Sequence, residues 1–214
     1  MFDFFRTILD IILPPKERVV RIDAYVLHDL NISPSEHEAC GARITTLMSY
    51  KTQAVEDLIR ALKYDGTGRA AQLLAEALAE YLREEIAQMK LFSSLPVILV
   101  PVPLHKNRSR VRGFNQTQRV LEKLPDEFKD GSVSRIVSDA LMRTRDTAQQ
   151  TRLSRAERLK NVTGAFSLAK PELIRNRNLI LIDDVTTTGA TLAEAAKPLQ
   201  IAGIATSLFA LAHA

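Results

Sequence analysis

The sequence predicts an α/β protein built on a parallel sheet. Two uninterrupted apolar runs, residues 96–102 and 179–182, are typical of strands that are buried on both faces. Helix-forming segments follow each run, at about residues 115–124 and from Ala190 onward. Strands that alternate with helices favour a parallel sheet with helices packed on its faces. The chain of 214 residues is long enough for one such domain with a small appendage.

The beginning of the chain predicts a small helical or irregular region ahead of this domain. Residues 2–13 have the apolar pattern of an amphipathic helix. Residues 18–27 are compatible with a strand, and residues 31–35 have the composition of a turn or loop. We therefore divide the chain into an N-terminal region, residues 1–50, and an α/β domain, residues 51–214.

The α/β domain begins with two predicted helices. Apolar residues at helical spacing predict a helix from Thr52 to a stop at Asp65 and Gly66, and a longer helix to about Met89. Residues 125–138 are expected to form a loop. The remaining elements are expected in this order: a short strand at 140–142, a short helix capped at Ser154 and ending near Asn161, a strand at 165–168, the strand at 179–182 with its helix, and a final strand at 204–211.

Composition is that of a globular protein in a reducing compartment. Hydrophobic residues make up 46% of the chain and charged residues 25%. A single cysteine, Cys40, excludes an intrachain disulfide framework and a cysteine-based zinc site. The apolar stretch near the start is too short to cross a bilayer and contains Asp3, Arg6 and Asp10. We therefore expect a cytoplasmic protein without a membrane span.

Charge is distributed unevenly along the chain. Residues 1–100 hold 11 Lys and Arg against 14 Asp and Glu, whereas residues 101–214 hold 18 against 11. A positive half of this kind concentrates anionic ligands near its surface. The pattern fits a phosphorylated substrate as well as it fits a nucleic acid.

The most informative segment follows the apolar run at 179–182. Two acids, Asp183 and Asp184, stand where the carboxyl end of a buried strand is expected, which is where open α/β sheets bind ligands. A turn of small and hydroxyl residues then leads into a helix, and backbone N–H groups at such a place bind phosphate. The ligand indicated is a phosphorylated sugar, whose hydroxyls the acids would hold. The candidate phosphate-binding residues are Thr186, Thr187, Thr188, Gly189, Ala190 and Thr191.

A second candidate segment follows the strand at 96–102. It places four cations within seven residues (Lys106, Arg108, Arg110 and Arg112), followed by Gly113, Asn115 and Gln116. Cations at the carboxyl end of a buried strand predict an anion-binding loop, and Asn115 is a suitable cap for the next helix. The alternative is a solvated surface loop, since runs of like charge are often only that.

A third segment, residues 143–166, is polar and basic. It contains Arg143, Gln150 and Arg158 and has few large apolar residues before Leu153. This composition fits a lid over a site that must exclude water. A surface loop and helix without a ligand would have a similar composition.

These segments together resemble known families. Residues 179–191 match the signature of the type I phosphoribosyltransferases: four apolar residues, two acids, and a Thr-Thr-Gly turn with a final Thr. The chain also resembles the ComF family, phosphoribosyltransferase-like proteins linked to bacterial competence. The elements that carry this resemblance over residues 47–214 are Leu62-Lys63-Tyr64-Asp65-Gly66, Pro101-Val-Pro-Leu-His105, Arg112-Gly-Phe-Asn-Gln116, and the spaced series Arg143, Thr147, Gln150, Leu153, Arg158, Asn161, Ala165 and Phe166.

The chain departs from the family pattern at two places. ComF relatives usually carry a cysteine-rich zinc ribbon after a Pro-Pro pair, but Pro14 and Pro15 are followed by a segment whose one cysteine is Cys40, so we expect no structural zinc. Thr187 stands where purine-salvage relatives place an acidic general base. Because threonine does not accept a proton near neutral pH, purine salvage is disfavoured.

The resemblance implies a phosphoribosyltransferase-like sheet and transfer of a phosphoribosyl group from phosphoribosyl diphosphate to an unidentified acceptor. Asp183, Asp184 and Arg112 are the implied catalytic residues, and Mg²⁺ is expected to be held mainly by the substrate, with the two acids contributing indirectly. The implied substrate-binding residues outside the Thr turn are Lys106, Arg108, Asn115, Gln116, Arg143, Gln150 and Arg158.

Other functions stay open on the sequence alone. The same site could serve regulation or the competence machinery without turnover, and the basic loops could bind single-stranded DNA. The DNA hypothesis is the weaker one, because such grooves normally interleave aromatic residues and only Phe114 and Phe166 lie near these loops. The sequence leaves a homodimer open as well.

Overall fold

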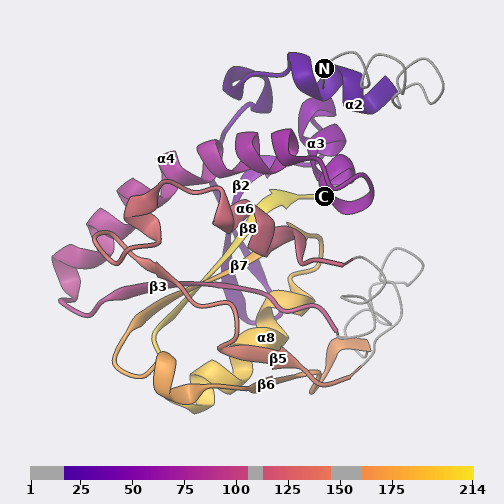
Figure 1. Cartoon of the computed structure of the whole chain (residues 1–214). Coiled ribbons are helices and arrows are strands. Elements are labelled where there is room, and N and C mark those ends of the chain that lie inside the picture. Colours follow the sequence, from indigo (N-terminus) through magenta and orange to yellow (C-terminus); the bar gives the residue numbers. More distant parts are fainter. Residues whose placement is uncertain (1–16, 106–112, 146–160) are drawn as a thin grey trace.

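A six-stranded sheet forms the centre of the protein (Figure 1). The structure is a computed structural model that describes residues 17–105, 113–145 and 161–214. β1 runs antiparallel to β2, and every other neighbouring pair is parallel, which confirms the predicted α/β fold with a mostly parallel sheet. In spatial order the strands are β1 (Ser35–Ala39), β2 (Ala42–Ser49), β8 (Thr206–His213), β7 (Asn178–Thr186), β3 (Val97–Pro101) and β4 (Arg135–Ile136).

Helices cover both faces of this sheet (Figure 1). On one face lie α3 (Gln53–Tyr64), α4 (Gly68–Phe92) and α6 (Gln116–Glu122), which share a buried core with the sheet. On the other face lie α8 (Ala190–Ile201) and a two-stranded sheet of β5 (Leu141–Arg143) and β6 (Phe166–Leu168), which share a second core. The sheet is therefore buried between two layers, as the continuous apolar runs of its central strands require.

The elements with strong hydrophobic periodicity form as predicted. In α3 the side chains of Val55, Leu58 and Ile59 are fully buried, and the helix ends just before the predicted stop at Asp65. The apolar run at 179–182 is buried on both faces of the sheet. Apolar periodicity predicts these elements well, because burying the apolar stripe of a helix or both faces of a strand contributes more free energy than local conformational preference does.

Two predictions near less regular segments are wrong. Residues 18–27 form no strand: they contain α2 (Glu17–Ala24) and the start of the 3-10 helix η1 (Leu27–Leu30). Their β-branched residues favour a strand locally, but Ile22 is buried against α3 and α4 in a helical register. Residues 125–138 are also more than a loop, since they contain the 3-10 helix η2 (Asp126–Phe128) and β4, which pairs with Ile98 and Leu99 of β3.

The N-terminal part of the chain contributes to the central sheet. Both β1 and β2 come from the first fifty residues, and β2 pairs with the C-terminal strand β8. The amphipathic stretch at 2–13 and the capping box at Ser154 lie outside the described residues. Among the helices in the described ranges, none combines the length and the apolar run that a bilayer crossing needs.

A buried carboxylate joins α2 to α3. Asp57 is 3% exposed and accepts hydrogen bonds from Arg21 Nε at 3.0 Å, Arg21 Nη2 at 3.1 Å and the Tyr25 hydroxyl at 3.0 Å. Burial alone would raise the pKa of Asp57, but the hydrogen bonds from Arg21 and Tyr25 outweigh it and hold that pKa below its usual value. A carboxyl with a lowered pKa stabilises the fold at pH values above its unfolded pKa.

We expect Asp57→Asn to lower the free energy of unfolding by about 1–2 kcal/mol at pH 7, because hydrogen bonds to the charged carboxylate are lost. The difference from the natural protein should be smaller at pH 3, below the ordinary carboxyl pKa of about 3.9, because the stabilisation from a lowered pKa is lost as the pH falls toward that pKa. Urea denaturation at both pH values measures this. Asp23→Asn, an exposed change on α2, is the control, and an equal deficit for Asp57→Asn at both pH values would contradict the assignment.

Candidate functional site

The candidate site lies where the parallel strands β3, β7 and β8 end, which we call the carboxyl edge of the sheet. Strand β7 is longer than the predicted 179–182 and extends through Asp183 and Asp184 to Thr186. The extension forms because β8 continues beside it, with Asp183 opposite Ala210 and Thr186 opposite His213. The acid pair is therefore fixed by the sheet, and Thr186 is a buried strand residue, 8% exposed.

The two acids extend toward opposite faces of the sheet. Successive side chains of a strand alternate between faces, and Ile180 and Ile182 pack in the core beneath α3 and α4. Asp184 continues that series, and its Oδ2 lies 3.0 Å from the Nζ of Lys63 on α3. Asp183 continues the opposite series, which packs beneath α8. The site therefore draws on both layers of the protein.

Lys63 is the site residue that the sequence analysis missed. Its side chain is 23% exposed, and that of Asp184 is 14% exposed. Burial would lower the pKa of Lys63, but the charge of Asp184 outweighs it and raises that pKa, so the ion pair is maintained. The available signal was a lysine inside the Leu62–Gly66 family element, directly after a buried residue of an amphipathic helix.

Asp183 carries the strongest electrostatic perturbation at this edge. Burial raises the pKa of Asp183 to about 7, and the neighbouring charge of Asp184 adds to that rise. A hydrogen bond from the Asp184 N–H to Asp183 Oδ1, at 2.9 Å, and the positive charges of Lys63 and Arg143 oppose it. The pair therefore carries less than its full negative charge near neutral pH, which reduces its repulsion of an anionic ligand.

The turn after β7 has the predicted form. Thr187 is exposed, Thr188 is half-buried, and Gly189 adopts a left-handed conformation with φ of 72° at the N-cap of α8. The first turn of α8 contains Ala190 and the half-buried Thr191. The first N–H groups of a helix have no acceptor within it, and the helix dipole favours negative charge there. The turn and helix together suit a phosphate group.

The connection between β1 and β2 forms one wall of this turn. Cys40 Sγ donates a hydrogen bond to the carbonyl oxygen of Thr188 at 3.2 Å. A Cβ atom at Gly189 would lie 2.6 Å from Ala39 Cβ and 2.7 Å from Ile44 Cδ1, so only glycine fits. The N-terminal region therefore shapes the candidate phosphate site, which the sequence alone did not indicate.

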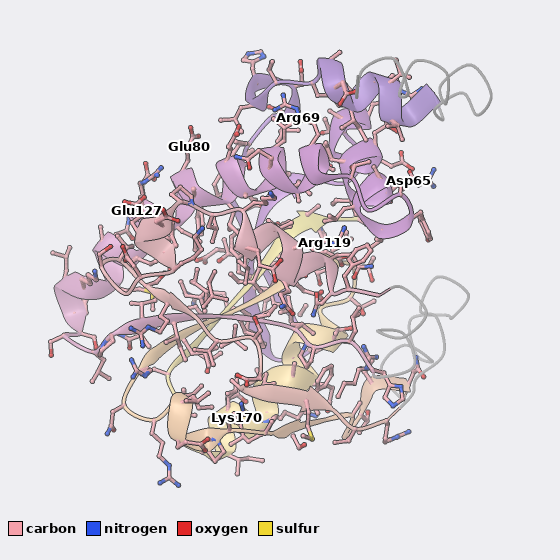
Figure 2. All side chains as sticks on the ribbon, in the orientation of Figure 1. Asp65, Arg69, Glu80, Arg119, Glu127 and Lys170 are labelled. Atoms are coloured by element: carbon pink, nitrogen blue, oxygen red, sulfur yellow. The ribbon has the colours of Figure 1, made fainter. Side chains whose placement is uncertain are left out.

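The second motif packs against the end of α3. Asn115 caps α6 by accepting from the Gln118 N–H at 3.3 Å, and its Nδ2 donates to the Val102 carbonyl at 2.9 Å. Arg119 donates to the carbonyl of Gly66 at 2.9 Å and stacks on the ring of Phe114 at 3.7 Å. Figure 2 labels Arg119 on α6 and Asp65 at the end of α3. Asn115 thus holds the structure of the edge, and Gln116 next to it is buried.

The third motif approaches the site from the α8 layer. Arg143 at the end of β5 is 7% exposed, and its guanidinium lies 5.2 Å from the centre of the Phe166 ring. The Gly164 N–H donates to Glu194 in α8 at 3.1 Å, which fixes this segment beside the helix. The charge of Arg143 acts on Asp183, so these two predicted residues lie in one electrostatic environment.

The described residues thus bring Asp183, Asp184, the Thr turn, Arg143 and Lys63 to one edge of the sheet. Five predicted residues lie outside the described ranges, and their roles stay predictions: Lys106, Arg108, Arg112, Gln150 and Arg158.

Known proteins are similar in sequence to this chain over about three quarters of its length, although no family model matches it. DNA utilization protein YhgH of Escherichia coli O6:H1 (strain CFT073) is 34% identical over 166 residues, which is 77% of this chain and 68% of that protein. Competence protein F of Haemophilus influenzae is 31% identical over 159 residues, or 74% of this chain and 67% of that protein. Competence protein ComFC of Streptococcus pneumoniae is 30% identical over 166 residues, which is 78% of this chain and 66% of that protein.

Proposed function

The chain belongs to the ComF family, and on that premise we propose that it binds phosphoribosyl diphosphate with Mg²⁺ at the carboxyl edge of its sheet and transfers the phosphoribosyl group to a nucleophilic acceptor. The observation that carries the proposal is the acid pair fixed at the end of β7, directly before a turn and helix N-terminus suited to phosphate. Acids beside an anion-binding turn match a ligand that has both hydroxyls and a phosphate.

In this proposal the turn after β7 binds the 5-phosphate of the substrate. The N–H groups of residues 188–191 and the hydroxyls of Thr187, Thr188 and Thr191 are the donors for its oxygens. Asp183 and Asp184 accept hydrogen bonds from the two ribose hydroxyls. Lys63 lowers the local negative charge, so that a diphosphate can approach two carboxylates.

The donor set fits Mg²⁺ only as an ion that arrives with the substrate. Carboxylate oxygens are suitable ligands, since Mg²⁺ is usually bound by one or two carboxylates together with substrate phosphates and water. No group of three or more His, Cys, Asp or Glu side chains converges for a metal within residues 17–105, 113–145 and 161–214. Asp183 and Asp184 are the residues that would contact its shell, and the ion would neutralise charge on the diphosphate.

The chemical step breaks the bond between the ribose anomeric carbon and the diphosphate oxygen and forms a bond from that carbon to the acceptor. The electron pair leaves with diphosphate, so the work of the protein is to position the groups and to stabilise negative charge on the leaving group. Lys106, Arg108 and Arg112 are the proposed cations for this task. The acceptor's proton goes to a base other than Thr187, which does not accept a proton near neutral pH.

Asp184→Asn tests this proposal. The change keeps the size of the side chain but removes its charge, and we expect the affinity for phosphoribosyl diphosphate in the presence of Mg²⁺ to fall by about 10- to 100-fold, since hydrogen bonds to charged groups contribute about 1.5–3 kcal/mol. Isothermal titration calorimetry measures it. Glu56→Gln, in an exposed ion pair on α3, is the control with the same charge change. Equal affinity of Asp184→Asn and the natural protein would refute the assignment.

A second function is a sensor that binds the sugar diphosphate without turnover and serves competence or DNA utilization, the roles in the names of the relatives. Thr187 in place of an acid favours this alternative, because the turn then supplies no general base. Release of diphosphate across a panel of amines and nucleobases separates the two functions. Single-stranded DNA that competes with the sugar diphosphate, with binding that weakens as salt rises, would indicate that the basic segments bind nucleic acid.

A further inference from the structure

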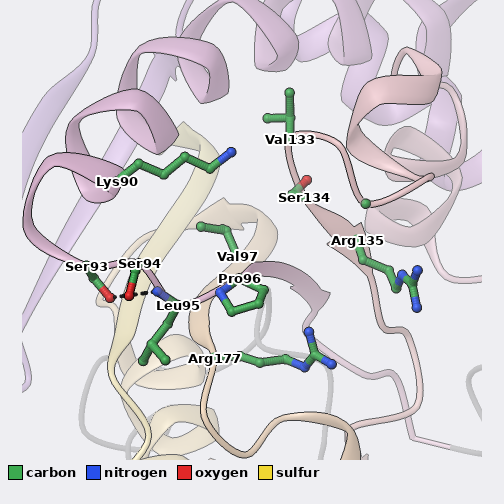
Figure 3. Close-up of a pocket in the computed structure, with 11 residues that line it drawn as sticks. Lys90, Ser93, Ser94, Leu95, Pro96, Val97, Val133, Ser134, Arg135 and Arg177 are labelled. Carbon is green, nitrogen blue, oxygen red and sulfur yellow. Dashed lines mark hydrogen bonds between the residues drawn. The ribbon is translucent and has the colours of Figure 1, made fainter.

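A pocket of about 560 Å³ lies where β3, β4 and β7 begin, at the opposite edge of the sheet from the acid pair (Figure 3). We call it the amino-edge pocket. It is about 20 Å from Asp184, since β7 rises about 3.3 Å for each residue from Asn178 onward. Its lining residues come from the end of α4, the start of β3, the turn before β4 and the residue before β7: Lys90, Ser93, Ser94, Leu95, Pro96, Val97, Gly131, Val133, Ser134, Arg135 and Arg177.

The charged residues that line this pocket are all cations. Lys90, Arg135 and Arg177 reach it from three different elements, and no acid is among its lining residues. Within the part of the chain that the structure describes, none of the three has a carboxylate within ion-pair distance. Three positive charges around one concave volume, without a neighbouring acid, raise the local concentration of anions.

The backbone that carries Arg135 and Arg177 is held by the sheet. Arg135 begins β4 opposite Ile98 of β3, and its guanidinium lies over Gly131, where a Cβ would be 3.4 Å from Nη2. Arg177 precedes Asn178, whose N–H donates to the carbonyl of Pro96 at 3.0 Å. Figure 3 shows Arg177 beside Pro96, Lys90 on the far side of Val97 from Arg177, and Arg135 across the pocket. Arg135 and Arg177 are therefore attached to the start of the sheet, and Lys90 to the end of α4.

The other residues that line the pocket are mainly apolar and suit the less polar part of a ligand. Leu95, Pro96, Val97 and Val133 give the pocket an apolar surface, and Ser93 and Ser94 lie beside Leu95, whose N–H donates to Ser93 Oγ at 3.3 Å. The volume falls within the range of about 300–1,000 Å³ that small-molecule sites occupy. Guanidinium groups bind phosphate oxygens with two parallel hydrogen bonds, which favours phosphate over a monatomic anion.

We propose that the amino-edge pocket is a second binding site, which takes a phosphorylated small molecule of about nucleotide size. The phosphate contacts Arg135, Arg177 and Lys90, and the less polar part of the ligand rests on Leu95, Pro96 and Val97. The site is separate from the carboxyl edge in space and in residues, so its ligand is bound independently of the proposed sugar diphosphate.

Calorimetric titration with adenosine 5′-monophosphate, and with adenosine as the probe that lacks the phosphate, tests the proposal. The titration is made with saturating phosphoribosyl diphosphate and Mg²⁺, because the monophosphate also carries the ribose 5-phosphate that the carboxyl edge would bind. We expect the monophosphate still to bind, and adenosine to bind at least tenfold more weakly. Arg135→Gln and Arg177→Gln should each reduce the affinity for the monophosphate by about tenfold. Arg175→Gln is the matched control, because Arg175 is an exposed arginine two residues away that does not line the pocket.

Asp184→Asn distinguishes this site from the proposed function, because it should leave unchanged the binding of the monophosphate that depends on Arg135 and Arg177. Equal binding of adenosine and its monophosphate would overturn the proposal. So would unchanged affinity in Arg177→Gln and Arg135→Gln, or an equal loss in Arg175→Gln, which would indicate general attraction of anions to a basic surface. An oligonucleotide that binds more tightly than the monophosphate, with the same dependence on Arg135 and Arg177, would overturn the small-molecule proposal. The ligand of the pocket would then be a nucleic acid.

Discussion

Gly189→Ala is expected to destabilise the protein by about 2–4 kcal/mol and to remove binding of the sugar diphosphate. The added methyl group would meet Ala39 Cβ at 2.6 Å and Ile44 Cδ1 at 2.7 Å, closer than carbon atoms approach one another, so β1, β2 or the turn must move. Gly189 also has a φ of 72°, which costs a residue with a Cβ about 1–2 kcal/mol. A movement of the turn, or of β1 or β2 against it, displaces the N–H groups at the start of α8 that would bind the phosphate.

Gly203→Ala separates the two causes. Gly203 has the same φ of 72°, but no atom lies within 4 Å of the position of its Cβ. This variant should lose only the conformational part, about 1–2 kcal/mol, and should keep its affinity for the sugar diphosphate. Urea denaturation and calorimetry measure both quantities. Equal losses of stability in Gly189→Ala and Gly203→Ala would mean that the contact of the N-terminal region with the Thr turn is absent.

The second large effect is expected at the pair of Lys63 and Asp184. Lys63→Met leaves a carboxylate without its cation in a site that is mostly closed to water, and we expect a loss of about 2–3 kcal/mol in the free energy of unfolding. Asp184→Asn leaves the ammonium group in the same position and should have a similar cost. The double variant removes both charges, so its loss should be smaller than the sum of the single losses by about 1–2 kcal/mol.

The exposed pair of Glu56 and Arg60 on α3 is the matched control for this cycle. Its atoms lie 3.1 Å apart, but its side chains are 29% and 52% exposed, and pairs of this kind contribute about 0.5 kcal/mol or less. Chemical denaturation of both cycles at pH 7 gives the two coupling energies. A coupling between Lys63 and Asp184 no larger than that of the exposed pair would show that the contact is not maintained in solution.

Much of the fold follows from the sequence because burial leaves a strong pattern. The helices α3 and α4 and the strands β3 and β7 have either helical periodicity or a continuous apolar run. Strand β1, with the sequence Ser-Glu-His-Glu-Ala, has no such pattern, because it is a largely polar edge strand that is specified by its pairing with β2. The strand prediction for residues 18–27 is wrong for a related reason. Helix α2 is specified by the burial of Ile22 and by the hydrogen bond from Arg21 to Asp57, which are contacts with distant parts of the chain.

The candidate site was predictable only where its residues are adjacent in the sequence. Asp183, Asp184 and the Thr turn form one short segment, and its context of strand and helix identified it. Lys63 is 121 positions away from Asp184, and Cys40 is 148 positions away from Thr188, so their contacts arise only from the packing of the layers. The amino-edge pocket has no sequence signature at all, because its three cations come from separate elements.

The most direct measurement is a calorimetric titration of the natural protein with phosphoribosyl diphosphate, once with Mg²⁺ and once with EDTA. We expect saturable binding at one site per chain at the carboxyl edge, with affinity that falls when Mg²⁺ is removed. No binding, or binding that is independent of Mg²⁺ and weakens only as the salt concentration rises, would contradict the proposed function.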